Sequence, residues 1–388
     1  MKICMISYSQ YEFDNRVHRY AQSLIRRGDN VDVLCLGAKN QAKSEMIQGV
    51  RLFRLQIRKY NESGPLVYLL NLLRFFFLST YHCSLLYIKN RYEVFHFHNI
   101  PDFGVFCTVV GRLCGARIVH DIHDLVPEFY QRKFNIGTSH PIFKILCLIE
   151  KMACRYAHYV ITVTDIWKKT IDHRSMSGKK CTVILNAPDS DLFKPDYAYH
   201  KAPPGNKLIY HGNLSEIFGV DLIIKAMPEI CREIKTAQLS IYGQGREKNK
   251  LINLTKKLNI SDKVIFYQPV GRTEVPDILK NADIGIDPKR NGILADEGLS
   301  SKCLEYLAMG LPVVVSKTKA ASCYYHDKMV LFFEPGNAPD LAKKIIYLCR
   351  NMSVRKNMVR QAMQFNQKYH WQKYETIYFA ILDNESNQ

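Results

Sequence analysis

The sequence predicts an α/β protein of two doubly wound, Rossmann-like domains. Short apolar runs alternate with segments of helical periodicity, which is the pattern of parallel strands joined by crossover helices. Most of these runs end in glycine, proline or polar residues, as strands do where ligands bind in open parallel sheets. A proline-rich break at 186–207 separates two such series. We therefore predict domains at 1–190 and 191–369, with a final helix of about 370–388 that packs back on the first domain.

The first series opens with a buried-strand pattern at residues 2–7. Apolar residues then recur at helical spacing from Val17 to Ile25, and Gly28 ends this helix because glycine adopts the left-handed conformation at little cost. A strand follows it, which completes a β-α-β opening. The strands expected in this half are 30–36, 93–99, 116–124, 158–164 and 181–188.

The second series repeats the architecture without repeating the sequence. Its runs are short and apolar, and helical patterns separate most of them. The strands expected here are 208–213, 237–243, 263–269, 282–288, 312–316 and 329–335, and an amphipathic helix is expected at 369–384. Two such domains that face each other form a cleft, which is the usual place for a large polar ligand.

Composition narrows the classes of partner. The 388 residues carry a formal net charge of +18, which favours anionic ligands or surfaces. We recognise no RNA-binding, zinc-finger or basic-region motif, so nucleic acid is not an expected partner. The 12 cysteines form no CxxC pair, which is typical of reduced thiols in a cytosolic protein. Without a recognisable signal peptide, we expect a cytoplasmic location, with peripheral attachment to the inner face of the membrane as a further option.

Residues 66–88 are the most apolar part of the chain. Their longest uncharged run, 64–73, stops at Arg74 and is too short to span a bilayer. Residues 51–100 contain seven Lys or Arg against two Asp or Glu. Two interpretations stay open: an ordinary core helix, or a half-buried helix that attaches to an anionic membrane surface.

Glu297 and Glu305 form a pair of acids around the start of a predicted helix. Ser300 or Ser301 can cap this helix, and Gly310 follows its end. Eight helical residues span about 12 Å, whereas a glycosidase pair needs about 5 Å if retaining and up to about 9.5 Å if inverting, so the spacing argues against a hydrolytic pair. The helix N-terminus between the acids suits a phosphate. The pattern predicts two contacts on one nucleotide-sugar; the alternative is two surface glutamates.

The segment from Glu297 to Ser316, EGLSSKCLEYLAMGLPVVVS, resembles the E-x7-E motif of the family 4 retaining glycosyltransferases, which have the GT-B fold. Other segments resemble this family in the same order, through nearly the whole chain: 15–34, 119–130, 185–195, 208–227, 239–251, 263–288 and 329–345. The resemblance implies transfer of a sugar from a nucleoside-diphosphate sugar to a glycan or lipid-linked acceptor. It also implies that no metal or other cofactor is needed.

The same resemblance assigns the donor site. Glu297 would hold hydroxyls of the donor sugar, Glu305 would hold the ribose, and the backbone of 298–301 would meet the sugar or the diphosphate. The family usually has E-G-F-G where this chain has Glu-Gly-Leu-Ser. The remaining donor-site residues implied are Gly298, Leu299, Ser300, Ser301, Lys302, Gly212, Asn213, Gly243, Arg246 and Val270.

His123 matches the family histidine that faces the donor sugar; the alternative is a structural histidine. It lies in a short stretch with His120, Asp121 and Asp124. Strand alternation places His120 on the face opposite Asp121 and His123, so we expect no metal site. Asp124 would bind acceptor hydroxyls or cap the following helix.

Asp14, Asn15 and Arg16 follow the first strand, where many relatives have a glycine-rich loop. We expect these residues on the acceptor side, in contact with the acceptor or a phosphate. The alternative is a helix whose N-cap is Asp14 and whose basic residues are exposed.

One departure from the family concerns the leaving diphosphate. Relatives carry an Arg and a Lys after the first strand of the second domain, and this chain has Asn213 and Phe218 there. Cationic donors stabilise charge on a leaving group, so we expect a substitute. Lys302 is the preferred one, and the other candidates are Lys289, Arg290 and Arg246. A non-catalytic nucleotide-sugar-binding partner of another transferase, or a sugar-nucleotide epimerase, stays open.

Overall fold

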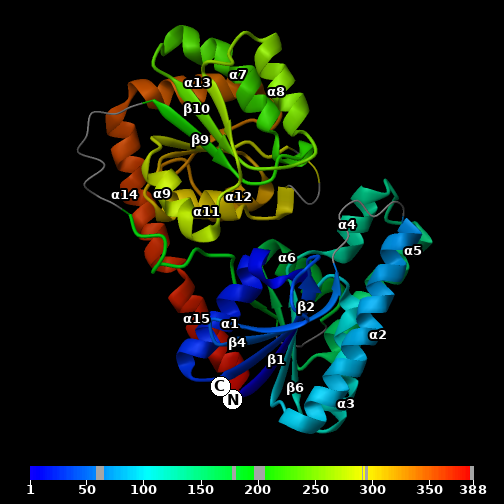
Figure 1. The fold of residues 1–388 in the computed structure, drawn as a ribbon. Coiled ribbons are helices and arrows are strands. Elements are labelled where there is room, and N and C mark those ends of the chain that lie inside the picture. The colour runs from blue at the N-terminus through cyan, green and yellow to red at the C-terminus, as the bar shows by residue number, and fades with distance from the viewer. Residues whose placement is uncertain (58–64, 177–180, 196–205, 291, 293–295, 385–388) are drawn as a thin grey trace. The chain divides into compact units, whose positions relative to one another are not determined.

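The computed structural model describes the chain except for residues 58–64, 177–180, 196–205, 291, 293–295 and 385–388 (Figure 1). Much of the predicted proline-rich break therefore lies outside the described residues. The chain divides into two compact units. The first unit comprises Met1–Leu185 and Glu375–Gln388, and the second comprises Asn186–Tyr374.

The first unit is built on an eight-stranded sheet in the order β3-β4-β2-β1-β5-β6-β7-β8. Its neighbouring strands are parallel except for β3 and β4, which are antiparallel. The strands are β1 (Lys2–Gln10), β2 (Asn30–Gly37), β3 (Ser44–Ile47), β4 (Val50–Ile57), β5 (Val94–His98), β6 (Arg117–Ile122), β7 (Tyr159–Thr162) and β8 (Cys181–Val183). The helices are α1 (Asn15–Arg27), α2 (Pro65–Asn90), α3 (Val109–Leu113), α4 (Val126–Lys133), α5 (Pro141–Tyr156) and α6 (Asp165–Arg174).

Both faces of this sheet are covered, which explains why its central strands are continuously apolar. Side chains of α2, α5, α6 and the 3-10 helix η2 (Asp102–Thr108) form one core with Cys4 and Ile6 of β1. On the other face, Tyr20 of α1 and Tyr378 of the C-terminal helix pack with ring centroids 4.4 Å apart. Gly28, with φ of 92°, closes α1 in the left-handed conformation that the sequence predicted.

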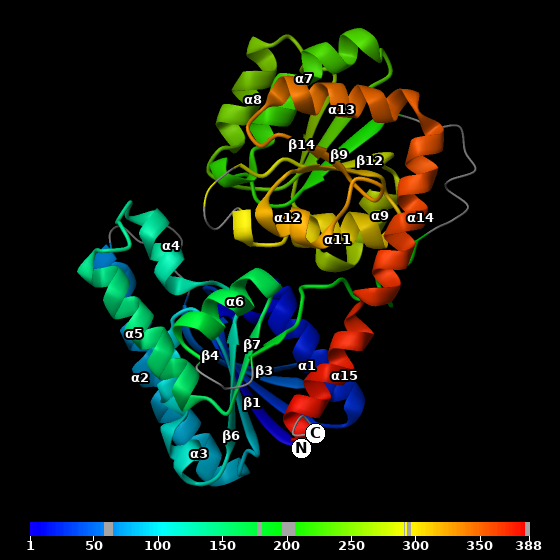
Figure 2. The same ribbon diagram turned by 180° about the vertical axis from the view of Figure 1, so that it is seen from behind.

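The second unit contains a six-stranded parallel sheet in the order β11-β10-β9-β12-β13-β14. The strands are β9 (Lys207–His211), β10 (Gln238–Tyr242), β11 (Val264–Tyr267), β12 (Ile284–Asp287), β13 (Val313–Ser316) and β14 (Leu331–Phe333). The helices are α7 (Val220–Glu233), α8 (Lys248–Lys257), α9 (Val275–Lys280), α11 (Ser301–Ala308), α12 (Lys319–Tyr324), α13 (Ala338–Arg350) and α14 (Met352–Lys368). Helices α7, α8 and α13 cover one face, and α9, α11, α12 and α14 cover the other (Figure 2).

The final helix, α15 (Trp371–Asp383), begins in the second unit and continues into the first. Its Tyr378 hydroxyl lies 2.8 Å from His96 Nδ1, and the following Asn384 accepts a hydrogen bond from Tyr159. The structure also contains strands β3 and β4, which were not predicted from the sequence. The strand predicted at 181–188 ends at Val183.

Candidate functional site

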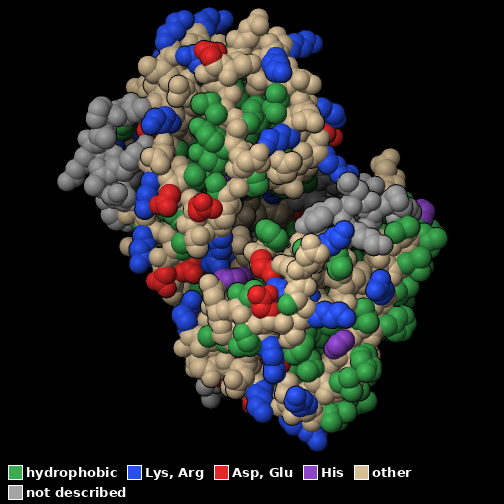
Figure 3. All heavy atoms as spheres, viewed as in Figure 1, with side chains coloured by type: hydrophobic (Ala, Val, Ile, Leu, Met, Phe, Trp, Pro, Cys, Tyr) green, Lys and Arg blue, Asp and Glu red, His purple; other side chains and the backbone are tan. Residues whose placement is uncertain are grey.

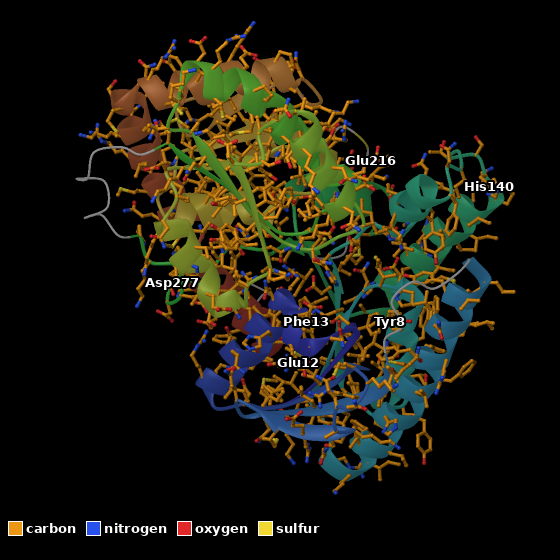
Figure 4. The ribbon with its side chains drawn as sticks, turned by 45° about the horizontal axis from the view of Figure 1, so that its top comes forward. Tyr8, Glu12, Phe13, His140, Glu216 and Asp277 are labelled. Carbon is orange, nitrogen blue, oxygen red and sulfur yellow. The ribbon has the colours of Figure 1, made fainter. Side chains whose placement is uncertain are left out.

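The first cluster lies at the carboxyl ends of β1, β5 and β6, which are neighbours in the sheet. A 3-10 turn that carries Glu12 and Phe13 leads from β1 into α1 (Figure 4). Asp14 caps α1 by accepting hydrogen bonds from the amides of Arg16 and Val17, each at 3.1 Å. The cap fixes the first turn of α1 and directs the Arg16 side chain inward.

Arg16 is buried, although the sequence predicted that it faces the acceptor or is exposed. Its Nε and Nη2 donate to the two carboxylate oxygens of Asp121 at 2.7 and 2.8 Å, and Nη1 donates to the carbonyl of Ile184 at 2.9 Å. Burial alone would raise the pKa of Asp121, but Arg16 and His98 together outweigh that effect and hold the pKa well below its ordinary value. The guanidinium is thus occupied within the first unit.

Two buried histidines of β5 adjoin the same carboxylate. His98 Nδ1 lies 3.3 Å and His96 Nε2 lies 3.9 Å from Asp121 Oδ2. Burial lowers the pKa of both imidazoles, which are therefore neutral at pH 7. Ligand atoms of His96, His98 and Asp121 lie close enough together to hold a metal ion. However, the Arg16 guanidinium already binds both oxygens of Asp121, so it balances the negative charge of the cluster without a metal ion.

His123 follows β6 in a loop that Asn99 organises. The Asn99 side-chain oxygen accepts from the amides of His123 and Asp124 at 3.0 and 3.3 Å, and its nitrogen donates to the Asp124 carbonyl at 2.6 Å. The His123 ring stands edge-on to His98, with centroids 6.2 Å apart. Among the described residues, His123 Nε2 has no hydrogen-bond partner. This nitrogen is buried and unpaired in that part of the chain.

Asp14 belongs to the same cluster as His123. Burial by itself raises the pKa of Asp14, but interaction with His123 and the 2.7 Å hydrogen bond from Ser9 outweigh it and lower the pKa. The structure therefore brings together the predicted residues Asp14 and His123. Asn15, the next predicted residue, is exposed at the start of α1.

The second cluster lies at the carboxyl ends of β9 and β10 in the second unit. The loops that follow these strands interlock, since the Gly212 amide donates to Tyr242 O at 2.9 Å and the Leu214 amide donates to Gln244 O at 3.0 Å. A Cβ atom on Gly243 would lie 2.0 Å from Gly212 O, and Gly212 itself has φ of 125°. Glycine is required at this crossing because any side chain would force the loops apart.

Lys302, in the first turn of α11, reaches these loops. Its aliphatic stem covers Gly212, and its Nζ lies 4.2 Å from the ring centroid of Phe218. Phe218 ends the 3-10 turn that begins at Glu216, the residue labelled in Figure 4. This is a cation–π contact. The family resemblance implies a lysine at position 218, where this chain has an aromatic ring, and the ammonium of Lys302 lies over that ring.

The other candidate cations have different surroundings. Arg290 pairs with Asp221 at 2.6 Å, and Lys289 donates to the Gly298 carbonyl at 2.8 Å. Arg246 is exposed in the loop after β10. Lys302 is the candidate that the structure places beside both Gly212 and Phe218.

Lys302 is only 8% exposed, and burial lowers the pKa of its ammonium, while Asp287 and Glu305 oppose this shift. Nearby, Ser300 is the N-cap residue of α11, but its side chain makes no capping bond. Its buried hydroxyl has no partner among the described residues. A small pocket beside Gly298 and Ser300 is also lined by Lys289 and Thr318. The N-terminus of α11 thus gathers a hydroxyl, a buried cation and free backbone amides.

The two predicted acids occupy different elements. Glu305 lies mid-helix in α11, where its Oε2 is 3.2 Å from His211 Nε2 at the end of β9. Glu297 lies in the segment before α11 and pairs with Lys319 Nζ at 3.6 Å. Val270 follows β11 at the edge of the same sheet. Sequence reasoning missed His211, whose only signal was its place as a polar residue ending an apolar strand.

Comparison with known proteins agrees with this arrangement. The family described as "Glycosyl transferases group 1" matches residues 198–365, and the "Glycosyl transferase 4-like domain" matches residues 14–187. The N-acetyl-alpha-D-glucosaminyl L-malate synthase of Bacillus anthracis is 26% identical over 77% of this chain and 77% of its own.

Solved structures show the same architecture. Sucrose-phosphate synthase from Thermosynechococcus elongatus superposes with a TM-score of 0.80 at 17% identity, over 99% of this chain and 98% of that one. HepE of Anabaena, solved in complex with UDP-glucose, gives a TM-score of 0.75 at 15% identity over 99% and 100%. These similarities establish the GT-B fold that the sequence predicted. The chain belongs to the group 1 family of GT-B glycosyltransferases.

Proposed function

We propose that this glycosyltransferase moves a hexosyl group from a nucleoside-diphosphate sugar to a hydroxyl of a glycan or lipid-linked acceptor, with retention of anomeric configuration. The observation that carries the proposal is the position of Lys302, whose ammonium lies over Phe218 beside Gly212. It supplies a buried positive charge at the N-terminus of α11, where a leaving diphosphate gains most from it. HepE, a structural neighbour, binds UDP-glucose.

In this proposal each predicted donor residue has one role. Glu305 binds the ribose hydroxyls, and Glu297 binds hydroxyls of the transferred sugar. The diphosphate is bound by Lys302, the Ser300 hydroxyl and the backbone amides from Gly298 to Ser301. The loops that carry Gly212, Asn213, Gly243, Arg246 and Val270 surround the nucleotide.

The transfer itself needs no covalent intermediate on the protein. The bond between the anomeric carbon and the diphosphate oxygen breaks, and the acceptor oxygen forms a new bond on the same face of the sugar. The acceptor proton passes to an oxygen of the departing diphosphate. His123 orients the donor sugar, and Asp14, Asn15 and Asp124 bind the acceptor. The proposal requires no metal or organic cofactor and places the protein in cytoplasmic glycoconjugate biosynthesis.

A thermal-shift screen of nucleoside diphosphates and their sugars tests the donor class. A ligand that binds only the folded state stabilises it by about 2.7 kcal/mol at a hundredfold excess over its Kd, so the true donor stands out. Turnover is then measured as donor hydrolysis or transfer. We expect Glu305→Ala to weaken donor binding and His123→Ala to reduce turnover while donor binding persists. If no nucleoside diphosphate or its sugar stabilises the protein, the proposal is wrong.

A second candidate function follows from Asn213 and Phe218, which are uncharged at the two positions where the family resemblance implies an Arg and a Lys. A protein that binds the donor but does not turn it over would be a non-catalytic partner of another transferase. Epimerised nucleotide-sugar formed without any acceptor would instead identify an epimerase. Product analysis of the purified protein, with and without acceptor, distinguishes the three activities.

A further inference from the structure

Helix α2 has one buried face and one exposed face. The buried face joins the core of the first unit through Leu72, Phe75, Cys83 and Tyr87, which are at most 6% exposed. On the opposite side, large apolar residues recur every three or four positions, except where Arg74 interrupts the row. The exposed members are Leu66, Leu70, Phe77, Tyr81, Leu85 and Ile88, each between 47% and 67% exposed. The stripe is apolar where a solvent-facing helix is ordinarily polar.

Helix α5 carries a second stripe of the same kind. Its exposed apolar residues are Ile142, Ile145, Leu148 and Met152, each about half exposed. Both α2 and α5 contact η2, and α3, which follows η2, adds Leu113 at 79% exposure. Both views of the molecule show α2 and α5 along the same side of the first unit (Figures 1 and 2). We call these eleven residues the apolar face.

Helices α2, α3 and α5 carry mostly positive charge. They carry six basic residues: Arg74, Lys89, Arg112, Lys144, Lys151 and Arg155. Their one acidic residue, Glu150, is buried and hydrogen-bonded to Arg174. Lys and Arg side chains lie among the hydrophobic ones on this side of the molecule (Figure 3). An apolar surface with a positive surround complements an anionic lipid bilayer.

By length and composition α2 could cross a membrane, because its Leu66–Asn90 segment has a mean hydropathy of 1.3. The sequence analysis predicted otherwise, because the uncharged run that ends before Arg74 is too short to span a bilayer. The structure argues against crossing, since Phe75, Cys83 and Tyr87 pack into the core beneath the sheet. Pulling α2 into the bilayer would expose that core, whereas laying it on the surface buries only the exposed face.

We propose that the apolar face docks on an anionic membrane, with α2 and α5 parallel to the bilayer and their apolar side chains in the headgroup–acyl boundary. Contiguous exposed apolar patches on soluble proteins mark interaction sites for proteins or membranes. This proposal does not depend on the donor or the reaction.

Vesicle flotation tests the proposal. The full chain should float with vesicles of phosphatidylglycerol and phosphatidylcholine, bind pure phosphatidylcholine at least tenfold less, and dissociate at high salt. The double variant Phe77→Glu and Leu148→Glu should bind at least tenfold less. The matched control is Tyr347→Glu on α13, where an apolar residue is 46% exposed in the second unit; it should bind within twofold of the unaltered protein. Unchanged thermal unfolding shows that the variants fold.

The depth of the apolar face in the bilayer is measured by the quenching of tryptophan fluorescence by brominated lipids. The native Trp167 and Trp371 are at most 4% exposed, so a tryptophan introduced on the apolar face reports its own environment. Phe77→Trp and Leu148→Trp should both be quenched, and Tyr347→Trp should not. The proposal is overturned by absence of flotation, by equal binding of the double variant, or by quenching at position 77 alone. It is also overturned if the unaltered chain forms a lipid-free dimer that the double variant breaks.

Discussion

Arg16 and Asp121 form a buried two-point ion pair that joins α1 to β6 across 105 positions of the chain. The planar guanidinium matches the carboxylate, with donor–acceptor distances of 2.7 and 2.8 Å. The side chains are 5% and 0% exposed. A third bond, to Ile184 O, ties the same guanidinium to the segment after β8. The pair thus holds the carboxyl edge of the first sheet, from which His123 projects.

Removal of the carboxylate charge should destabilise the protein strongly. Asp121→Asn leaves the Arg16 guanidinium buried without its counter-ion, which costs about 3–5 kcal/mol of unfolding free energy. Urea denaturation measures the loss. In the double variant with Arg16→Met the cost should be well below the sum of the single costs. Additive costs would show that the pair does not act as a unit.

The stability of the first unit should fall as pH decreases. Burial lowers the pKa of His96 and His98, so the unfolded chain takes up protons below about pH 6.5 that the folded protein does not. Two such protons give a slope of at most about 2.7 kcal/mol per pH unit near pH 6. Asp14 and Asp121, whose pKa values are lowered, extend the loss below about pH 4.

Unfolding free energies between pH 5 and 8 measure this slope. His98→Asn should halve it, because one of the two titrating groups is then absent. A stability that rises toward pH 5 in the unaltered protein would contradict the assignment of neutral buried histidines.

The sequence predicted the alternation of strands and helices well because each depends on local periodicity. Gly28 and the helix that starts at Ser301 are examples, since each has its signal within a few residues. The sequence did not predict which side chains pair across the sheet. Strand alternation placed Asp121 and His123 on one face, but nothing local showed that Arg16 would be buried against Asp121.

Only part of the candidate site was predicted, because its contacts join residues that are far apart in the sequence. Lys302 was chosen among several cations, and its contact with Phe218 is decided by how the loop after β9 folds over α11. His211 contributes to the surroundings of Glu305 from a strand almost a hundred positions earlier. The exposed face of α2 could not be distinguished from a core helix, since hydropathy does not report which side of a helix is covered.

Lys302→Met should separate folding from donor binding. The buried ammonium has a lowered pKa, so its charge costs stability in the folded protein at pH 7. The variant keeps the apolar contacts and should unfold at an equal or higher temperature. Its affinity for a nucleoside diphosphate should drop by about 2 kcal/mol, or about thirtyfold.

Isothermal titration with the nucleoside diphosphate that the screen identifies measures this loss. Lys343→Met, which changes an exposed lysine of α13, is the matched control and should bind normally. Normal binding by Lys302→Met would transfer the diphosphate role to another cation, with Arg246 the first to test.

Glu305 should recognise the ribose, and His211 should position it. The Nε2 of His211 lies 3.2 Å from Glu305 Oε2, so the imidazole contacts the carboxylate near the end of β9. A carboxylate that accepts ribose hydroxyls favours the nucleoside diphosphate over its 2′,3′-dideoxy analogue. That preference should be about tenfold or more in the unaltered protein, because a hydrogen bond to a charged group contributes about 1.5–3 kcal/mol. In Glu305→Ala the two ligands should bind equally, and in His211→Phe the preference should shrink without disappearing. Competition binding with both ligands supplies the measurement. If Glu305→Ala weakens both ligands by the same factor and the preference survives, then Glu305 supports the site without contacting the ribose.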